Sequence, residues 1–172
     1  MSNVVTPIKD QGKCDGCWAF SAVATIEGAY NYKTGSLNSF SEQELVDCTN
    51  SGHYYTCNVG GEMPDGVDYI APSQSGYIYT ESAYLYTATS CSIPKDCCSA
   101  ESNTGVATGI TGHTALTSGD EGALKSAAGT YPVISVGISA RRRCSSSREN
   151  STKIPSPRMD PAALPTDPHQ RD

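Results

Sequence analysis

The sequence lacks any long apolar run, and its first residues lack the features of a targeting segment. Its 172 residues contain no stretch near the roughly 20 apolar residues that a membrane-spanning helix requires. Residues 1–7, MSNVVTP, have neither the basic start nor the apolar core of a signal peptide. We therefore expect no membrane contact and no signal peptide.

Basic residues are scarce in most of the chain. Residues 1–140 carry five basic and fourteen acidic side chains, a net charge of −9, whereas residues 141–172 carry seven basic and four acidic ones. Because phosphate binding needs clustered Lys and Arg, the acidic part argues against nucleic acid as a partner.

Histidine is scarce too, with His53, His113 and His169 far apart in the sequence. Beside the pair Cys14 and Cys17, a zinc site needs a second cysteine pair or suitably spaced histidines, and the adjacent Cys97 and Cys98 are poorly placed to bind one ion together. We therefore predict neither a metal nor another cofactor.

Cysteine, by contrast, is abundant. Eight cysteines in 172 residues favour a disulfide-containing protein of an oxidising compartment, which means a secreted, lysosomal or vacuolar one. The alternative is a reduced cytosolic protein with several buried thiols.

Local patterns predict both helices and strands. Residues 17–33 are apolar on nearly all sides, which predicts a buried helix. Two capping boxes of the form S-x-x-E, at Ser41 and Ser118, predict helices that reach residues 48 and 128. Other predicted features are a helix over 64–70, a strand over 132–138 and a tyrosine-rich, half-buried surface over 77–86.

The composition changes after Ala140. Residues 141–172 hold five of the ten prolines, no aromatic residue and no hydrophobic period, so we predict a domain over 1–140 and a disordered tail over 141–172. The tail is either a natural linker or the product of a frameshift or a retained intron. The lack of a partner sheet for the strand at 132–138 favours the second origin.

Cys17 lies where the glycine-containing loop QGKCDGC, residues 11–17, meets the predicted buried helix. The first N–H groups of a helix and its dipole favour a thiolate, which is the nucleophilic form of cysteine. The side chain of Gln11 offers a donor for an oxyanion beside the Cys17 N–H. Cys14 and Cys17 also fit a structural pair, a redox dithiol or part of a metal site, so these local residues leave several roles open.

The stretch QGKCDGCWAFS, residues 11–21, resembles the active-site motif QGxCGSCWAFS of papain-like (cathepsin-type) cysteine peptidases. Later segments resemble the same family in the same order: FSEQELVDC at 40–48, CNVGGEM at 57–63, TESAYLY at 80–86, and 132–138. The resemblance covers about residues 4–140. It implies the family's two-domain α+β fold, with a helical left domain and only the beginning of a β-rich right domain.

The resemblance also implies roles for individual residues. Cys17 matches the nucleophile and Gln11 matches the side chain of the oxyanion hole. Gly60 and Gly61 match the strand that pairs with an extended substrate, and Met63 matches the beginning of the S2 pocket, which implies an apolar P2 preference. The implied disulfides are Cys14–Cys57 and Cys48–Cys91, with no family partner for Cys97, Cys98 and Cys144.

The chain departs from the family pattern near the expected nucleophile. Asp15 places a negative charge two residues before Cys17, which opposes thiolate formation. Val59 is an extra residue inside the C-N-G-G motif, so we expect an altered register of the two glycines. Ile134 is a second insertion, and the family's short D-W-R lead-in and its propeptide are missing.

The largest departure concerns the general base. The family places its His and Asn roughly 130–150 residues after the cysteine, and the corresponding window, about 147–167, contains no histidine. His169 and Asn150 lie in the proline-rich tail, His113 precedes a helix and His53 lies in a loop, so none matches the family's base or its partner.

By resemblance, the function is hydrolysis of peptide bonds in a peptide or protein substrate, by a monomer that forms an acyl-enzyme. Without the base we expect little or no turnover from this chain alone. The alternatives are a non-catalytic relative that binds peptides and a disulfide-stapled structural module.

Overall fold

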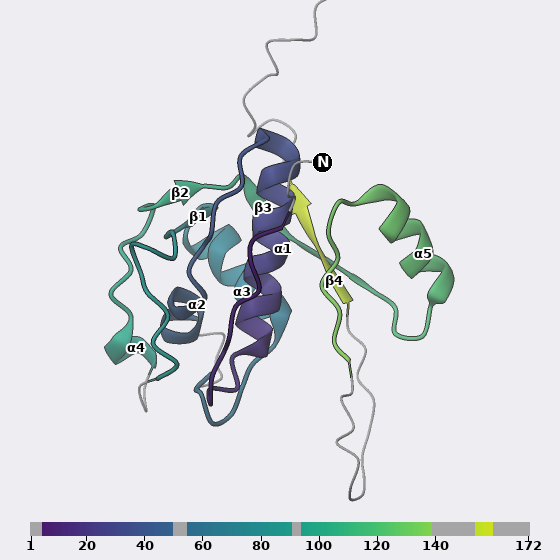
Figure 1. Cartoon of the computed structure of the whole chain (residues 1–172). Coiled ribbons are helices and arrows are strands. Elements are labelled where there is room, and N and C mark those ends of the chain that lie inside the picture. Colours follow the sequence, from purple (N-terminus) through teal and green to yellow (C-terminus); the bar gives the residue numbers. More distant parts are fainter. Residues whose placement is uncertain (1–4, 50–54, 91–93, 139–153, 160–172) are drawn as a thin grey trace, which may run out of the picture.

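The computed structural model describes residues 5–49, 55–90, 94–138 and 154–159 (Figure 1). Helices and two small antiparallel sheets make up the described part of the chain, which confirms the α+β class. The helices are α1 (Cys17–Thr34), α2 (Glu42–Cys48), α3 (Met63–Asp68), the π-helical turn η1 (Tyr69–Ser73), α4 (Pro94–Cys97) and α5 (Glu121–Thr130). The strands are β1 (Tyr77–Ile78), β2 (Val106–Ala107), β3 (Ile110–Leu116) and β4 (Ile154–Met159).

Helix α1 is the centre of the core, as its apolar sequence predicts. Segments from both ends of the described chain pack around it (Figure 1). Its buried side chains include Trp18, Val23 and Ile26, and Gly35 ends it in the left-handed conformation at φ 71°. Glycine adopts this conformation without a steric penalty, and the Gly35 N–H caps the carbonyl of Asn31.

Helix α2 begins at the predicted cap, but only half of the capping box forms. The Ser41 hydroxyl accepts a hydrogen bond from the Glu44 N–H at 3.0 Å. The Glu44 side chain does not return to the Ser41 N–H, which donates instead to the carbonyl of Tyr79. Glu44 accepts from the Tyr79 N–H at 2.8 Å, so both halves of the sequence motif tie α2 to the segment that follows β1.

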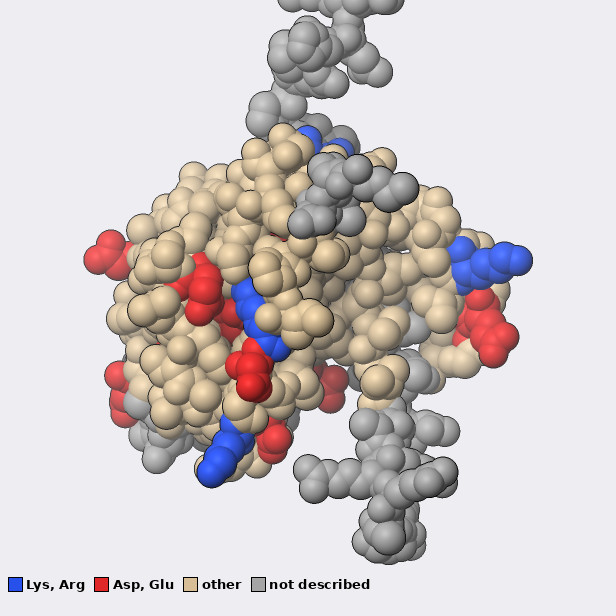
Figure 2. Space-filling model, in the orientation of Figure 1, with Lys and Arg blue, Asp and Glu red and all other residues tan. Residues whose placement is uncertain are grey.

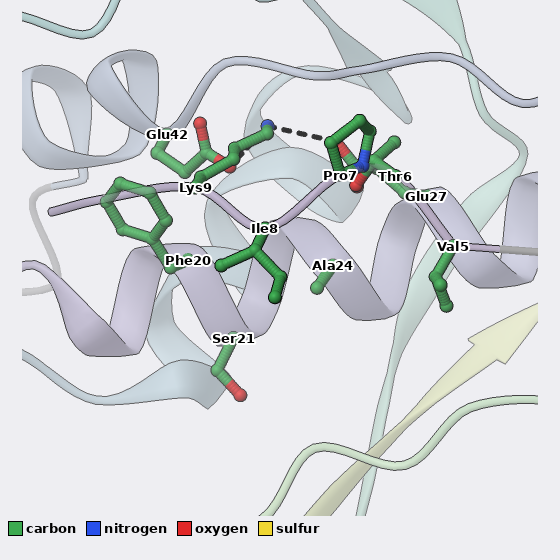
Figure 3. Close-up of a pocket in the computed structure, with 10 residues that line it drawn as sticks. All are labelled: Val5, Thr6, Pro7, Ile8, Lys9, Phe20, Ser21, Ala24, Glu27 and Glu42. Atoms are coloured by element: carbon green, nitrogen blue, oxygen red, sulfur yellow. Dashed lines mark hydrogen bonds and ion pairs between the residues drawn. The ribbon is translucent and has the colours of Figure 1, made fainter.

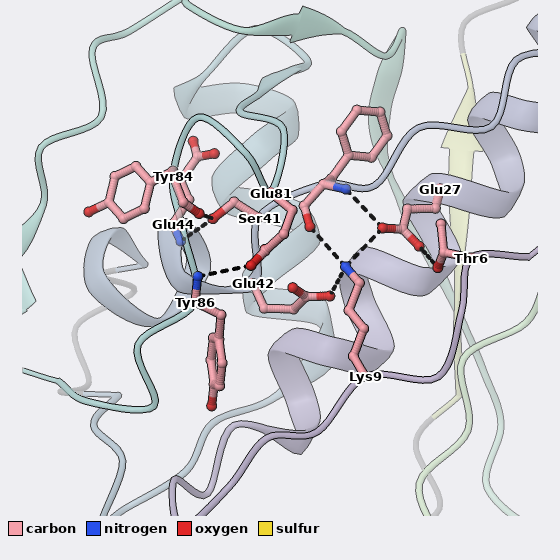
Figure 4. A network of polar contacts seen from close by, with 10 residues as sticks. Thr6, Lys9, Glu27, Ser41, Glu42, Glu44, Glu81, Tyr84 and Tyr86 are labelled. Carbon is pink, nitrogen blue, oxygen red and sulfur yellow. Dashed lines mark hydrogen bonds and ion pairs between the residues drawn. The ribbon is translucent and has the colours of Figure 1, made fainter.

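A buried polar network joins the N-terminal segment to α1 and α2 (Figure 4). The Lys9 ammonium lies 3.2 Å from a Glu27 carboxylate oxygen of α1 and 2.6 Å from one of Glu42 in α2. Glu27 also accepts from the Phe40 N–H and the Thr6 hydroxyl. Burial lowers the pKa of Lys9, but the hydrogen bonds and charges of the two glutamates outweigh it and raise that pKa. Lys9 is therefore a permanent cation between the three segments.

The segment predicted as a strand over 132–138 is not a strand within the described residues, and that prediction is wrong. It packs on α1 through side chains: Val133 fills the space that a Cβ on Gly28 would occupy, and the Ser135 hydroxyl contacts that of Ser21. Gly28 and Ser21 are seven residues apart, so they share one face of the helix. High β-propensity does not make a strand without a neighbouring ladder of hydrogen bonds.

The prediction of disorder does not hold for residues 154–159, which form β4 antiparallel to β3. Prolines at 155 and 157 cannot donate to a ladder, which is tolerated at a sheet edge. The sheet contains only these two strands among the described residues. A domain boundary at residue 140 remains a prediction.

Helix α5 begins later than its capping box predicts. Asp120, rather than Ser118, is its N-cap, and the Asp120 carboxylate accepts from the Ala123 N–H at 2.8 Å. A carboxylate is as good an N-cap as a hydroxyl, and its negative charge also complements the helix dipole. Asp120, which is closer to the helix than Ser118, therefore determines where α5 begins.

The surface of the described part carries few cations. On the face in Figure 2, lysine side chains lie apart from one another rather than in one basic patch. No helix among the described residues has the length and apolarity that crossing a membrane would demand.

The buried carboxyl of Glu44 predicts how stability depends on pH. Its side chain is 1% exposed, and burial raises its pKa from 4.5 to about 7 despite hydrogen bonds from Tyr79 and Tyr69. The folded state therefore holds this proton more tightly than the unfolded state does. The stabilisation is present below about pH 4.5 and is lost as the pH rises to 7, and it amounts to roughly 3 kcal/mol.

Glu44→Gln imitates the protonated carboxyl and should flatten the fall in unfolding free energy between pH 4.5 and 7, measured by urea denaturation. The exposed Glu101→Gln is the matched control and should keep the wild-type slope. Equal slopes for both variants would contradict a raised pKa at Glu44.

Candidate active site

Cys17 is the first residue of α1, and it is the free cysteine of the described residues, with an exposed side chain. The preceding Gly16 is the N-cap, and its carbonyl accepts from the N–H groups of Ala19 and Phe20. The next residue, Trp18, is buried with its ring centroid 5.3 Å from that of Tyr55. The thiol is therefore held at the surface by a neighbour that is fixed in the core, and it lies where the helix dipole favours negative charge.

The loop before Cys17 folds back on itself around Gln11. The Gly12 N–H donates to the Asp10 carboxylate at 2.8 Å, and Gly12 has the left-handed φ of 63°. The Gln11 side-chain amide donates to the Cys14 carbonyl at 3.0 Å. An amide has two N–H groups, so one remains to bind an oxyanion while the other fixes the side chain.

A disulfide joins this loop to the chain 43 residues later. Cys14 and Cys57 are bonded as the family resemblance implies, with their Cα atoms 4.2 Å apart. The Asp15 N–H donates to the Cys57 carbonyl at 2.9 Å, which adds a backbone contact next to the covalent one. Cys14 and Asp15, which precede Cys17 in the loop, are thereby both joined to Cys57.

The second predicted disulfide is wrong. Cys48 is bonded to Cys98, with 4.8 Å between their Cα atoms, and not to Cys91, which lies outside the described residues. Helix α4 packs against α2, and this brings the residue just after α4 to the C-terminal end of α2, where Cys48 lies. Cys97 is also disulfide-bonded, so both adjacent cysteines serve the framework.

Gly60 and Gly61 follow a tight turn that contains the extra residue. Thr56 and Gly60 form an antiparallel bridge, in which the Gly60 N–H donates to the Thr56 carbonyl at 2.9 Å. Val59 is the last residue of this turn and is 74% exposed, so the turn accommodates the insertion at the surface. Gly60 has the left-handed φ of 74°, and a Cβ on it would lie 3.4 Å from the Asp15 carbonyl, beside the nucleophile loop.

Met63, the predicted S2 residue, begins α3 and is only 9% exposed. The Ser135 hydroxyl donates to its sulfur at 2.8 Å, so this side chain faces the segment 132–138. Its predicted role at P2 remains a prediction.

His113 has a partner other than Cys17. Its Nδ1 lies 2.9 Å from the Asp68 carboxylate, and the pair joins β3 to the end of α3. His53, His169 and Asn150 lie outside the described residues, as does Cys144. In the part of the chain that the structure describes, no group of three or more His, Cys, Asp and Glu side chains is arranged to hold a metal.

A cavity lies away from Cys17. It measures about 360 Å³ and separates the N-terminal segment from the middle of α1 (Figure 3). Its walls include Pro7, Phe20 and Ala24, and also Glu27 and Glu42 of the polar network. None of the predicted site residues lines it, so it is not a substrate cleft for the thiol.

Sequence reasoning gave Tyr86 no individual role, although it ends the segment that resembles the family over 80–86. Its hydroxyl donates to the Gln11 carbonyl at 2.9 Å, and its ring packs edge-on against Phe20 with 4.8 Å between centroids. The motif at 80–86 contains Tyr86, but only the folded structure shows that this residue contacts the loop of Gln11.

Gly61 should tolerate no side chain. A Cβ there would lie 2.7 Å from the Trp18 ring and 2.8 Å from that of Tyr55, and both rings belong to the core. We expect Gly61→Ala to lower the free energy of unfolding by about 1–3 kcal/mol, measured by urea denaturation. Gly129→Ala, in α5 with open space around it, should be neutral or stabilising. If Gly61→Ala were as stable as Gly129→Ala, the close approach of the turn to Trp18 would be refuted.

The comparisons with known proteins agree with this geometry. The profile of the family described as "Papain family cysteine protease" matches residues 1–152. "Digestive cysteine proteinase 2" of Homarus americanus is 46% identical over 136 residues, which are 79% of this chain and 39% of that protein. "Cysteine proteinase 2" of Dictyostelium discoideum is 44% identical over 138 residues, which are 80% of this chain and 34% of that protein.

A solved structure, that of digestive procathepsin L 3 of Tenebrio molitor larval midgut, matches with a TM-score of 0.62 and 37% identity. The match covers 75% of this chain and 39% of that one. The chain thus spans about two fifths or less of the length of these relatives. With the family profile matched over most of its residues, the chain belongs to the papain family of cysteine proteases.

Proposed function

We propose that this chain carries the nucleophilic half of a cysteine peptidase site, with Cys17 as nucleophile and Gln11 as oxyanion donor. The observation that carries the proposal is the exposed, free Cys17 at the start of α1, next to a Gln11 loop that a disulfide holds in place. Membership of the family supports peptides and proteins as substrates.

The chemistry available to these residues is acyl transfer to sulfur. The Cys17 thiolate attacks a carbonyl carbon and forms a C–S bond, while the carbonyl oxygen becomes an oxyanion. The Cys17 N–H and the free N–H of the Gln11 amide stabilise that charge. The intermediate collapses, the leaving group departs with the electron pair of its bond, and a thioester remains.

A peptide amine leaves only when it is protonated, and a water that attacks the thioester needs a base. Cys17 has no histidine partner among the described residues, where His113 is paired with Asp68. We propose that this chain alone forms an acyl-enzyme with activated substrates. We also propose that it hydrolyses a peptide amide more slowly than an intact relative does. Gly60 and Gly61 are the proposed backbone partners of an extended peptide, and Met63 the proposed apolar contact for P2.

We also propose an oxidising setting, which means a secreted, lysosomal or vacuolar protein. The Cys14–Cys57 and Cys48–Cys98 disulfides support this proposal, because disulfides persist in such compartments. The lobster and beetle relatives are named as digestive enzymes.

A peptide p-nitrophenyl ester tests this proposal, because nitrophenolate leaves without a proton. We expect a burst of about one nitrophenolate per chain, followed by slow turnover, and no burst with Cys17→Ala. Gln11→Ala should slow the burst about 10- to 100-fold, somewhat less than the loss of an oxyanion donor costs a complete enzyme. Alkylation of Cys17 by iodoacetamide, which forms no oxyanion, should be unchanged.

Lys13→Gln is the matched control, since this side chain is exposed in the same loop, and it should keep the wild-type burst. A chain that reacts with iodoacetamide but gives no burst would favour a peptide-binding relative or a structural module. If the burst of Gln11→Ala were as fast as that of Lys13→Gln, the proposed role of Gln11 as an oxyanion donor would be contradicted.

A further inference from the structure

The loop that contains Gln11 is joined to the rest of the chain at two places. It contains two glycines and has the left-handed residue Gly12 directly after Gln11. The Cys14–Cys57 disulfide fixes its second half. The first half, where Gln11 lies, is fixed on its backbone by a different residue, Tyr86.

Tyr86 touches both ends of this loop. Its hydroxyl donates to the Gln11 carbonyl at 2.9 Å. The same oxygen would lie 3.2 Å from a Cβ on Gly16, the residue just before Cys17. The hydroxyl therefore lies between the backbone of the oxyanion donor and the N-cap of the nucleophile helix. Burial raises the pKa of Tyr86, so the hydroxyl keeps the proton that it donates.

Tyr86 is itself held from two sides. Its N–H donates to the Glu81 carboxylate at 2.9 Å, as Figure 4 shows. Both the N–H and the hydroxyl of Thr87 donate to the Gln43 side-chain oxygen of α2, at 2.8 and 3.0 Å. Tyr86 thus connects α2 and the loop after β1 to the glycine-containing loop of Gln11.

We infer that Tyr86 is a positioning residue, which sets the Gln11 donor relative to Cys17 through the hydrogen bond from its hydroxyl to the Gln11 carbonyl. The inference rests on the proposed function, because it concerns the oxyanion that Gln11 would bind. Tyr86 does not touch the reacting atoms, so its effect must pass through Gln11.

Tyr86→Phe removes the hydroxyl and keeps the ring that packs on Phe20. We expect it to slow the ester burst about 3- to 10-fold, the size of one hydrogen bond, and to leave iodoacetamide alkylation of Cys17 unchanged. Tyr84→Phe is the matched control: it removes a hydroxyl that contacts Asp47 and the Cys97 carbonyl, away from the Gln11 loop. It should leave both rates unchanged, and urea unfolding checks that both variants are folded.

The double variant Gln11→Ala with Tyr86→Phe separates positioning from a general structural effect. If Tyr86 acts through Gln11, the double variant reacts with the ester as fast as Gln11→Ala alone. A Tyr86→Phe burst equal to that of Tyr84→Phe would overturn the inference. Equal slowing of both reagents, or a further loss in the Gln11→Ala background, would also overturn it. If Gln11→Ala itself has no effect, the proposed function fails at Gln11 and the inference falls with it.

Discussion

The Cys14–Cys57 disulfide is the constraint on which the arrangement around the thiol depends. It joins the loop before α1 to the turn that carries Gly60 and Gly61, across 43 residues. With the backbone contact from Asp15 to Cys57, it fixes this turn close to Trp18. The closed loop reduces the entropy of the unfolded chain, and it places the backbone of Gly60 next to Asp15, two residues before Cys17.

Buried charge supplies the second constraint. Lys9 pairs with Glu27 and Glu42, so it attaches the N-terminal segment to two helices at once (Figure 4). Breaking such a pair leaves a charge buried without compensation, which is costlier than the net gain from forming it. The network therefore restricts how the segment that leads to Gln11 can move, even though no member of it takes part in the proposed chemistry.

Sequence reasoning succeeded where a local motif decides the structure. The start of α1 and the Ser41 cap were predicted from short local motifs, whereas the Cys14–Cys57 disulfide was implied by the family resemblance. It failed where tertiary contacts decide. Cys48 is bonded to Cys98 because α4 packs on α2. Residues 132–138 pack on α1 through their side chains and do not form a strand. The contact from Tyr86 to Gln11 spans 75 residues, and no local pattern encodes it.

We propose that half of a substrate-binding site is formed around Cys17 without the histidine. Chiral recognition tests this proposal, because an exposed thiol with no formed site around it shows little preference between mirror images of a reagent. We would react the chain with an epoxysuccinyl peptide of L-residues and with its D-residue enantiomer, and follow labelling of Cys17 by mass spectrometry. The account predicts faster labelling by the L-form. Equal rates would show an exposed cysteine with no formed site around it.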